Sequence, residues 1–145
     1  MIFRVLAAAV SFMALASAPA LAQTNLGELL DAGGKKLSKQ EVEAALSGAA
    51  LSGDMPSGAT FQTDYKSDGT YSGAFTSPQN KRNGTTFGKW TVDDAGKVCT
   101  DGTIRLYENQ PQKICAFYFK SGDQYFVSTS DSDRGAGIMK RTIKK

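Results

Sequence analysis

The chain has 145 residues, a formal net charge of +3 at neutral pH and no histidine. This length suits one domain with one core, and the nearly balanced charge does not favour a nucleic-acid partner. The lack of histidine excludes Ser-His-Asp and Cys-His catalytic sites and removes a common metal ligand. We therefore expect no cofactor, no metal and no nucleic acid.

Residues 1–22 have the pattern of a secretory signal peptide. A positive charge precedes an apolar stretch over 5–15, and the small-x-small triplet Ala20-Leu21-Ala22 follows. Cleavage is predicted between Ala22 and Gln23. The alternative is a membrane anchor, but crossing a bilayer takes about 20 apolar residues, and serine and proline interrupt this stretch. We expect a periplasmic or secreted protein with no transmembrane segment in the mature chain.

Residues 23–57 are predicted to hold two short helices followed by a loop. Leucines at helical spacing favour the first helix. The run 38–41, Ser-Lys-Gln-Glu, predicts a capping box for a second helix that ends near residue 48. Glycine, aspartate and proline over 52–58 then predict a loop.

Residues 58–145 are predicted to form a β domain that folds as one unit with 23–57. Alternating apolar and polar residues between short Gly/Asp turns predict about seven strands, and Phe61, Thr63 and Tyr65 share one face. The predicted strands are 58–65, 70–75, 85–92, 97–107, 113–120, 124–130 and 136–143. With no helix between them, they favour an antiparallel meander that forms a small barrel or a sandwich. The fold class is therefore mainly β, preceded by two short helices.

Cys99 and Cys115 are the only cysteines in the chain, and both follow the predicted cleavage site. An oxidising compartment favours their pairing in a disulfide. Fifteen residues separate the two cysteines. In the chain-entropy model, closing a loop of that size stabilises the fold by on the order of 3 kcal/mol. A metal or redox role is the alternative, but the spacing is not Cys-x-x-Cys.

Basic residues gather at the C-terminus of the chain, at Lys140, Arg141, Lys144 and Lys145. Such a cluster could contact anionic lipid or a cell-wall polymer. A solvated, frayed tail is the interpretation that we favour.

A set of turn, core and disulfide motifs spans nearly the whole mature chain. The motifs are Leu37 to Gly48, Tyr65-x-x-Asp68-Gly69-Thr70, Gly88-x-Trp90-x-Val92, Gly96-x-x-Cys99, and Cys115 with Gly122-Asp123-x-Tyr125. Together they resemble a group of small exported bacterial proteins that are classed only as domains of unknown function. The Gly-x-Trp strand followed by a meander is also similar to the lipocalin-type small barrels. Trp90 is predicted to be buried, since it shares a strand face with Val92.

Acidic residues offer the remaining catalytic candidates, which are Asp93, Asp94, Asp101 and Glu108. A carboxylate-based hydrolase needs two acids about 5 to 9.5 Å apart. Asp93 and Asp94 lie in a predicted turn, where aspartate supports the backbone through its own hydrogen bonds. Over 131–135, Asp131-x-Asp133-x-Gly135 faintly resembles a calcium loop but lacks a third oxygen ligand and the closing glutamate. We favour turn roles for all of these.

Aromatic residues are the main resource for binding. Neighbouring aromatics over 117–119 and 125–126 point to opposite faces of their strands, so some rings lie outside unless the helices cover them. Tyr118, Phe126 and Tyr107 are therefore the predicted binding residues at a partner surface.

The favoured function is a non-catalytic exported protein that binds another envelope protein or a cell-wall component, for example as an inhibitor. The loops 77–84 and 131–135 are predicted contact sites. The first alternative is a carrier of a small apolar ligand in the mouth of a barrel. Its cavity would be lined by Phe61, Phe75, Trp90 and Phe117. An open apolar cavity would favour the carrier, and the second alternative is the carboxylate-based hydrolase.

Overall fold

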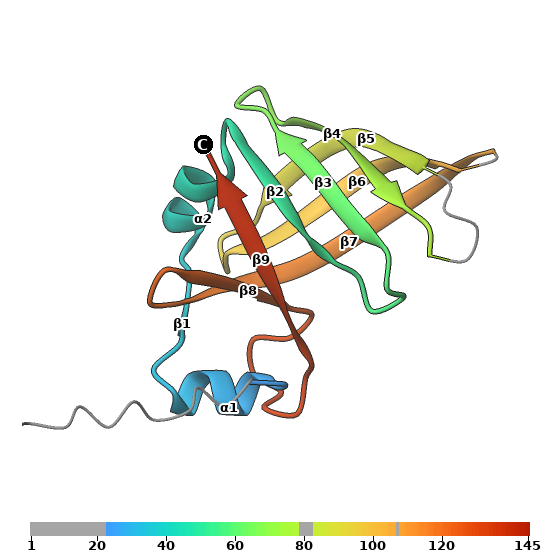
Figure 1. The fold of residues 1–145 in the computed structure, drawn as a ribbon. Helices are drawn as coiled ribbons and strands as arrows, with labels where there is room; N and C mark the ends of the chain where they lie inside the picture. Colours follow the sequence, from blue (N-terminus) through green and yellow to red (C-terminus); the bar gives the residue numbers. More distant parts are fainter. Residues whose placement is uncertain (1–22, 79–82, 107) are drawn as a thin grey trace, which may run out of the picture.

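The computed structural model describes residues 23–78, 83–106 and 108–145. The predicted signal peptide, residues 1–22, lies outside these ranges. The elements in chain order are α1 (Leu26–Asp31), β1 (Lys35–Lys36), α2 (Lys39–Leu46), β2 (Ala49–Asp54), β3 (Thr60–Tyr65), β4 (Thr70–Thr76), β5 (Asn83–Val92), β6 (Lys97–Arg105), β7 (Asn109–Ser121), β8 (Gln124–Ser128) and β9 (Ile138–Lys144) (Figure 1). In the described ranges, neither helix has the length and apolar character needed to cross a membrane.

Eight of these strands form a closed antiparallel barrel. Each strand from β2 to β8 pairs with the next one along the chain, and β9 also pairs with β2. Pairing all the way round leaves no free edge in the ring. The prediction of a mainly β, antiparallel meander is confirmed, and the meander closes into a barrel.

Short turns with an aspartate and a glycine join several of the strands, as the sequence predicts. Between β3 and β4, Asp68 accepts hydrogen bonds from the amide and the hydroxyl of Thr70, at 2.8 and 2.6 Å. Gly69 follows with a φ of +82°, a conformation that glycine adopts without strain. The hydrogen bonds from Thr70 also lower the pKa of Asp68 below its ordinary value. These local contacts fix where β3 ends and β4 begins.

Helix α2 covers one end of the barrel, beside the ends of β2 and β9 (Figure 1). Its predicted capping box is confirmed: the Glu41 amide donates to Ser38 Oγ at 3.3 Å, and the Ser38 amide donates to Glu41 Oε2 at 2.8 Å. Val42 and Leu46 are fully buried. They pack in one core cluster with Tyr65, Tyr71, Trp90, Val98, Tyr118 and Val127. The helix therefore closes this end with apolar side chains.

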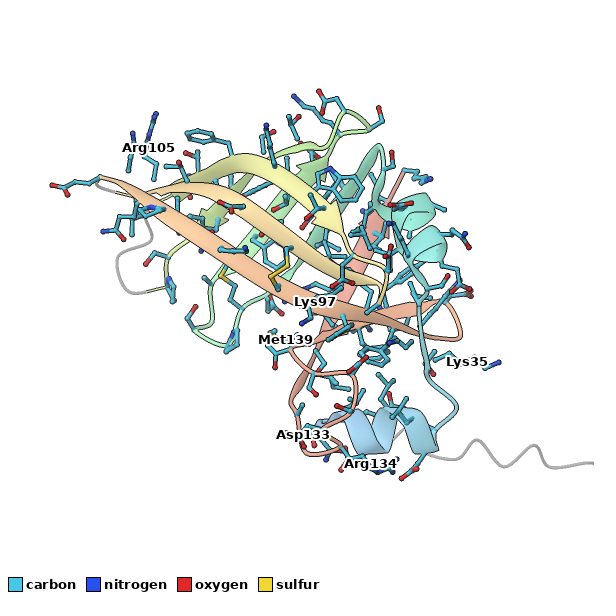
Figure 2. The ribbon with its side chains drawn as sticks, turned by 180° about the vertical axis from the view of Figure 1, so that it is seen from behind. Lys35, Lys97, Arg105, Asp133, Arg134 and Met139 are labelled. Carbon is cyan, nitrogen blue, oxygen red and sulfur yellow. A yellow bond between two sulfur atoms is a disulfide. The ribbon has the colours of Figure 1, made fainter. Side chains whose placement is uncertain are left out.

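Helix α1 packs on the outside of the barrel. Its Leu26 and Leu29 form a second buried cluster with Phe117 and Phe119 of β7. Figure 2 shows Asp133 and Arg134, from the loop between β8 and β9, beside this helix. Arg134 Nη2 donates to both carboxylate oxygens of Asp31, at the end of α1, at 2.7 Å each. The helix therefore covers the outward aromatic side chains of β7.

The predicted disulfide between Cys99 and Cys115 is present. The two residues are direct partners across β6 and β7, and the bond is visible in yellow between these strands in Figure 2. Val98 and Ala116, their neighbours in sequence, are also partners: Val98 belongs to the inner core cluster and Ala116 lines the cavity. Because side chains alternate along a strand, the disulfide lies on the outer face of the barrel.

The helix-and-loop prediction for 23–57 is wrong for β1 and β2. The sequence of β2, Ala-Ala-Leu-Ser-Gly-Asp, has little intrinsic preference for a strand. It forms one because its backbone pairs with β3 on one side and β9 on the other. The frayed C-terminal tail is wrong for the same reason, because β9 extends to Lys144 and pairs with both β2 and β8.

Candidate functional site

The barrel holds a cavity of about 480 Å³. Side chains alternate between inside and outside along every strand, and the cross-strand register brings inward residues together. Phe61 faces Phe75, and Thr100 faces Ile114. The apolar part of the lining includes Leu51, Met55, Phe61, Phe75, Ile104, Ile114, Ala116, Val127 and Met139.

The cavity opens at the end of the barrel opposite α2. Met55 and Pro56, in the turn after β2, line it at this end, together with Thr129 just after β8. Ile114 also lines the cavity and is 49% exposed, which is unusual for a large aliphatic residue. An inward-facing isoleucine that solvent can reach marks the mouth.

Buried tyrosines supply neutral polar groups to the cavity wall. Burial raises the pKa of Tyr65 to about 12. Burial also raises the pKa of Tyr118 well above its ordinary value. Tyr71 accepts a hydrogen bond of 3.3 Å from the Thr86 hydroxyl. Tyr65 and Tyr118 therefore stay protonated at neutral pH, and their hydroxyls can donate hydrogen bonds.

Arg141 of β9 brings a positive charge into the lining. It is only 7% exposed, and its Nη1 donates to the main-chain oxygens of Asp54 and Lys140, both at 2.9 Å. Its guanidinium carbon lies 4.9 Å from the centre of the Phe61 ring. Burial lowers the pKa of Arg141, but arginine keeps its charge in proteins.

The sequence prediction for Arg141 is therefore wrong, because it treats the residue as part of a solvated basic cluster. Lys140 and Lys144 of that cluster are exposed, whereas Arg141 faces inward. The alternation of side chains along the strand could have indicated this, because Met139, Arg141 and Ile143 occupy every second position of β9. Two apolar neighbours on the same face mark Arg141 as an inward residue.

The aromatic lining predicted for a carrier is partly present. Phe61 and Phe75 line the cavity. Trp90 faces inward but belongs to the core cluster at the α2 end, and it is not among the lining residues described. The prediction that Phe117 lines the cavity is wrong, because Phe117 lies on the outer face of β7 and packs under α1.

The three predicted binding residues do not form one surface in the described part of the chain. Tyr118 faces inward and lines the cavity. Phe126 packs from outside against the α1 cluster and is half-buried. Tyr107, and residues 79–82 of the predicted contact loop, lie outside the described residues. A binding role for these residues stays a prediction.

The acidic candidates lie away from the cavity, and none is among its described lining residues. Asp93 accepts hydrogen bonds from the amides of Ala95 and Lys97, both at 2.9 Å, so it holds the turn. Asp94 pairs with Lys39 at 3.0 Å. Asp101 and Glu108 are exposed, on β6 and in the turn that follows it.

The faint calcium motif also has local partners. Asp131 forms an ion pair of 2.7 Å with Lys36, which lowers the pKa of its carboxyl. Asp133 accepts a hydrogen bond of 2.9 Å from the Gly135 amide. In the ranges that the structure describes, no three His, Cys, Asp or Glu side chains gather as metal ligands do.

A scan against protein-family models finds no matching family, and a search of curated proteins finds no matching relative. The resemblance to exported bacterial domains of unknown function therefore stays a prediction. The cavity and its lining are the features from which a function can be argued.

Proposed function

We propose that the protein binds a small, largely apolar molecule in the barrel cavity and carries it. The observation that carries this proposal is an open, mostly apolar cavity of about 480 Å³ that α2 closes at one end. This volume falls within the range of ligand pockets, roughly 300 to 1,000 Å³. Small eight-stranded barrels are also known to hold one small ligand.

The composition of the outer surface favours the carrier function over a function in binding another protein. An exposed, continuous apolar patch marks many protein-docking surfaces. On β7, however, α1 covers Phe117 and Phe119. Among the described residues, Phe87 and Ile114 are the exposed large hydrophobic side chains, and Ile114 belongs to the cavity mouth. The described surface therefore offers a partner little apolar material.

Binding can be tested with N-phenylnaphthylamine, a neutral probe whose fluorescence emission rises in apolar surroundings. Substitutions at two neighbouring threonines of β5 then test whether the probe binds in the cavity. Thr86 lines the cavity, whereas Thr85 is exposed on the outer face. The T86F variant fills part of the cavity and should weaken probe binding. The matched T85F variant should bind as the unchanged protein does.

The carrier proposal fails if the unchanged protein does not bind the probe. It also fails if T86F, shown to be folded by circular dichroism, binds the probe with unchanged affinity. Binding lost equally in T85F and T86F would place the probe elsewhere than the cavity and would also count against a carrier.

We also propose that the chain is exported and processed, which the Cys99–Cys115 disulfide supports because such bonds persist in oxidising compartments. The intact mass of protein isolated from its native compartment should correspond to residues 23–145, allowing for pyroglutamate at Gln23. Native mass spectrometry of the same sample should show an added small molecule that denaturation releases. A protein that keeps residues 1–22 would contradict export.

A further inference from the structure

Arg141 is a buried cation that forms no ion pair in the described part of the molecule, although the Asp54 carboxylate raises its pKa from farther away. The ion pairs found there lie at the surface, and none of them includes Arg141. None of the lining residues described is acidic. Removing a charge from water is strongly unfavourable unless an opposite charge compensates it. The main-chain oxygens that Arg141 contacts are neutral and supply only part of that compensation.

The hydrogen bonds of Arg141 leave part of its guanidinium available to a ligand. A guanidinium carries five N–H donors. Nη1 has two carbonyl acceptors, whereas the acceptor described for Nη2 is the Met139 sulfur at 3.4 Å, which accepts only weakly. Planar donors of this kind match the two oxygens of a carboxylate.

The surroundings of Arg141 hold its side chain in one place. It crosses Gly53 of β2, where an added Cβ would lie 2.9 Å from Nη1 and 3.1 Å from Cδ. The Asp54 main-chain oxygen and the Phe61 ring fix its end. A preorganised donor loses little freedom when a ligand binds. The missing side chain at position 53 is therefore what lets the guanidinium take this position.

We propose that the ligand is an anionic amphiphile, with a carboxylate head group that accepts hydrogen bonds from Arg141 and an apolar tail against Phe75, Ile104 and Ile114. This inference rests on the proposed carrier function and narrows its ligand class. Arg141 supplies the compensating charge, and the apolar wall receives the tail. A fully apolar ligand would leave the buried cation without an ion pair.

The test compares decanoate with decanol and methyl decanoate as competitors of bound N-phenylnaphthylamine. The unchanged protein should bind decanoate more tightly than either neutral analogue. Hydrogen bonds to a charged group are worth about tenfold to hundredfold in affinity. The R141M variant should lose this preference and should bind decanol as before. The matched K140M variant removes a neighbouring, exposed charge and should keep the preference.

The outcomes separate this inference from the carrier proposal. If the unchanged protein does not bind the probe, the carrier proposal fails and the ligand class fails with it. If decanoate, decanol and methyl decanoate bind the unchanged protein equally, only the carboxylate assignment is overturned. That comparison needs no variant, so it decides the matter even if R141M does not fold. Equal losses for decanoate in R141M and K140M would also overturn a specific role for Arg141.

Discussion

Trp90 donates a hydrogen bond from its indole Nε1 to the main-chain oxygen of Lys66, 2.9 Å away, and so joins β5 to the turn after β3. The indole also meets the Tyr65 ring edge to face, with 5.5 Å between the ring centres. Trp90 is 9% exposed, which confirms its predicted burial. One side chain therefore provides both apolar area and a polar tie at the closed end of the barrel.

Replacing Trp90 should show how much each contribution is worth. We expect W90A to lower the free energy of unfolding by about 3 to 5 kcal/mol, as loss of a core aromatic does. W90F keeps a ring and should cost less, because Lys66 O still accepts from the Gly69 amide. Urea unfolding measures both changes. T91A, at an exposed neighbour, should stay within about 0.5 kcal/mol of the unchanged protein.

Fluorescence gives an independent measurement, because Trp90 is the only tryptophan in the chain. Its emission should be blue-shifted, and iodide should quench it poorly. Free quenching in the folded protein would contradict the burial of this side chain.

Loss of the Cys99–Cys115 disulfide should destabilise the barrel without opening it. The C99A/C115A double variant avoids a free thiol, and its free energy of unfolding should fall by about 2 to 5 kcal/mol. Its far-ultraviolet circular dichroism should be unchanged, because backbone pairing between β6 and β7 continues on both sides of the bridge. An unfolding midpoint equal to that of the unchanged protein would show that the bridge adds no stability.

Tyr65 should make the barrel sensitive to alkali. Its pKa is about 12 in the folded chain against 10.0 for the free side chain. A pKa raised by folding gives stability that is present below pH 10 and is lost as the pH rises from 10 to 12. The difference corresponds to about 3 kcal/mol. In urea unfolding across this pH range, Y65F should lose less stability than the unchanged protein. Equal losses would refute this role of Tyr65.

The sequence predicts the parts of this fold that depend on local rules. Turn positions are readable because Asp68 and Asp93 bond to the backbone within a few residues. The shared face of Phe61, Thr63 and Tyr65 is readable because strand alternation has a fixed period.

The parts that the sequence does not predict depend on distant partners. Strand β2 has weak local preference and forms through pairing with strands on both sides. The cavity depends on closure of the ring, and its charged lining depends on a glycine in β2 lying beside Arg141 of β9. No local window of sequence contains both residues, so the site becomes visible only when the two strands are side by side.

The pairing of β2 with β9, which closes the ring, also constrains the order of folding. Leu51 and Ile143 are partners, although almost the whole β domain lies between them in sequence. Contacts at such long range form slowly, because a large loop must be ordered before they can stabilise anything. Until residues 138–144 join the sheet, β2 and β8 remain open edges that could pair with other chains. By pairing with both edges, the last strand protects the barrel from aggregation, and a chain shortened before β9 would leave both edges exposed.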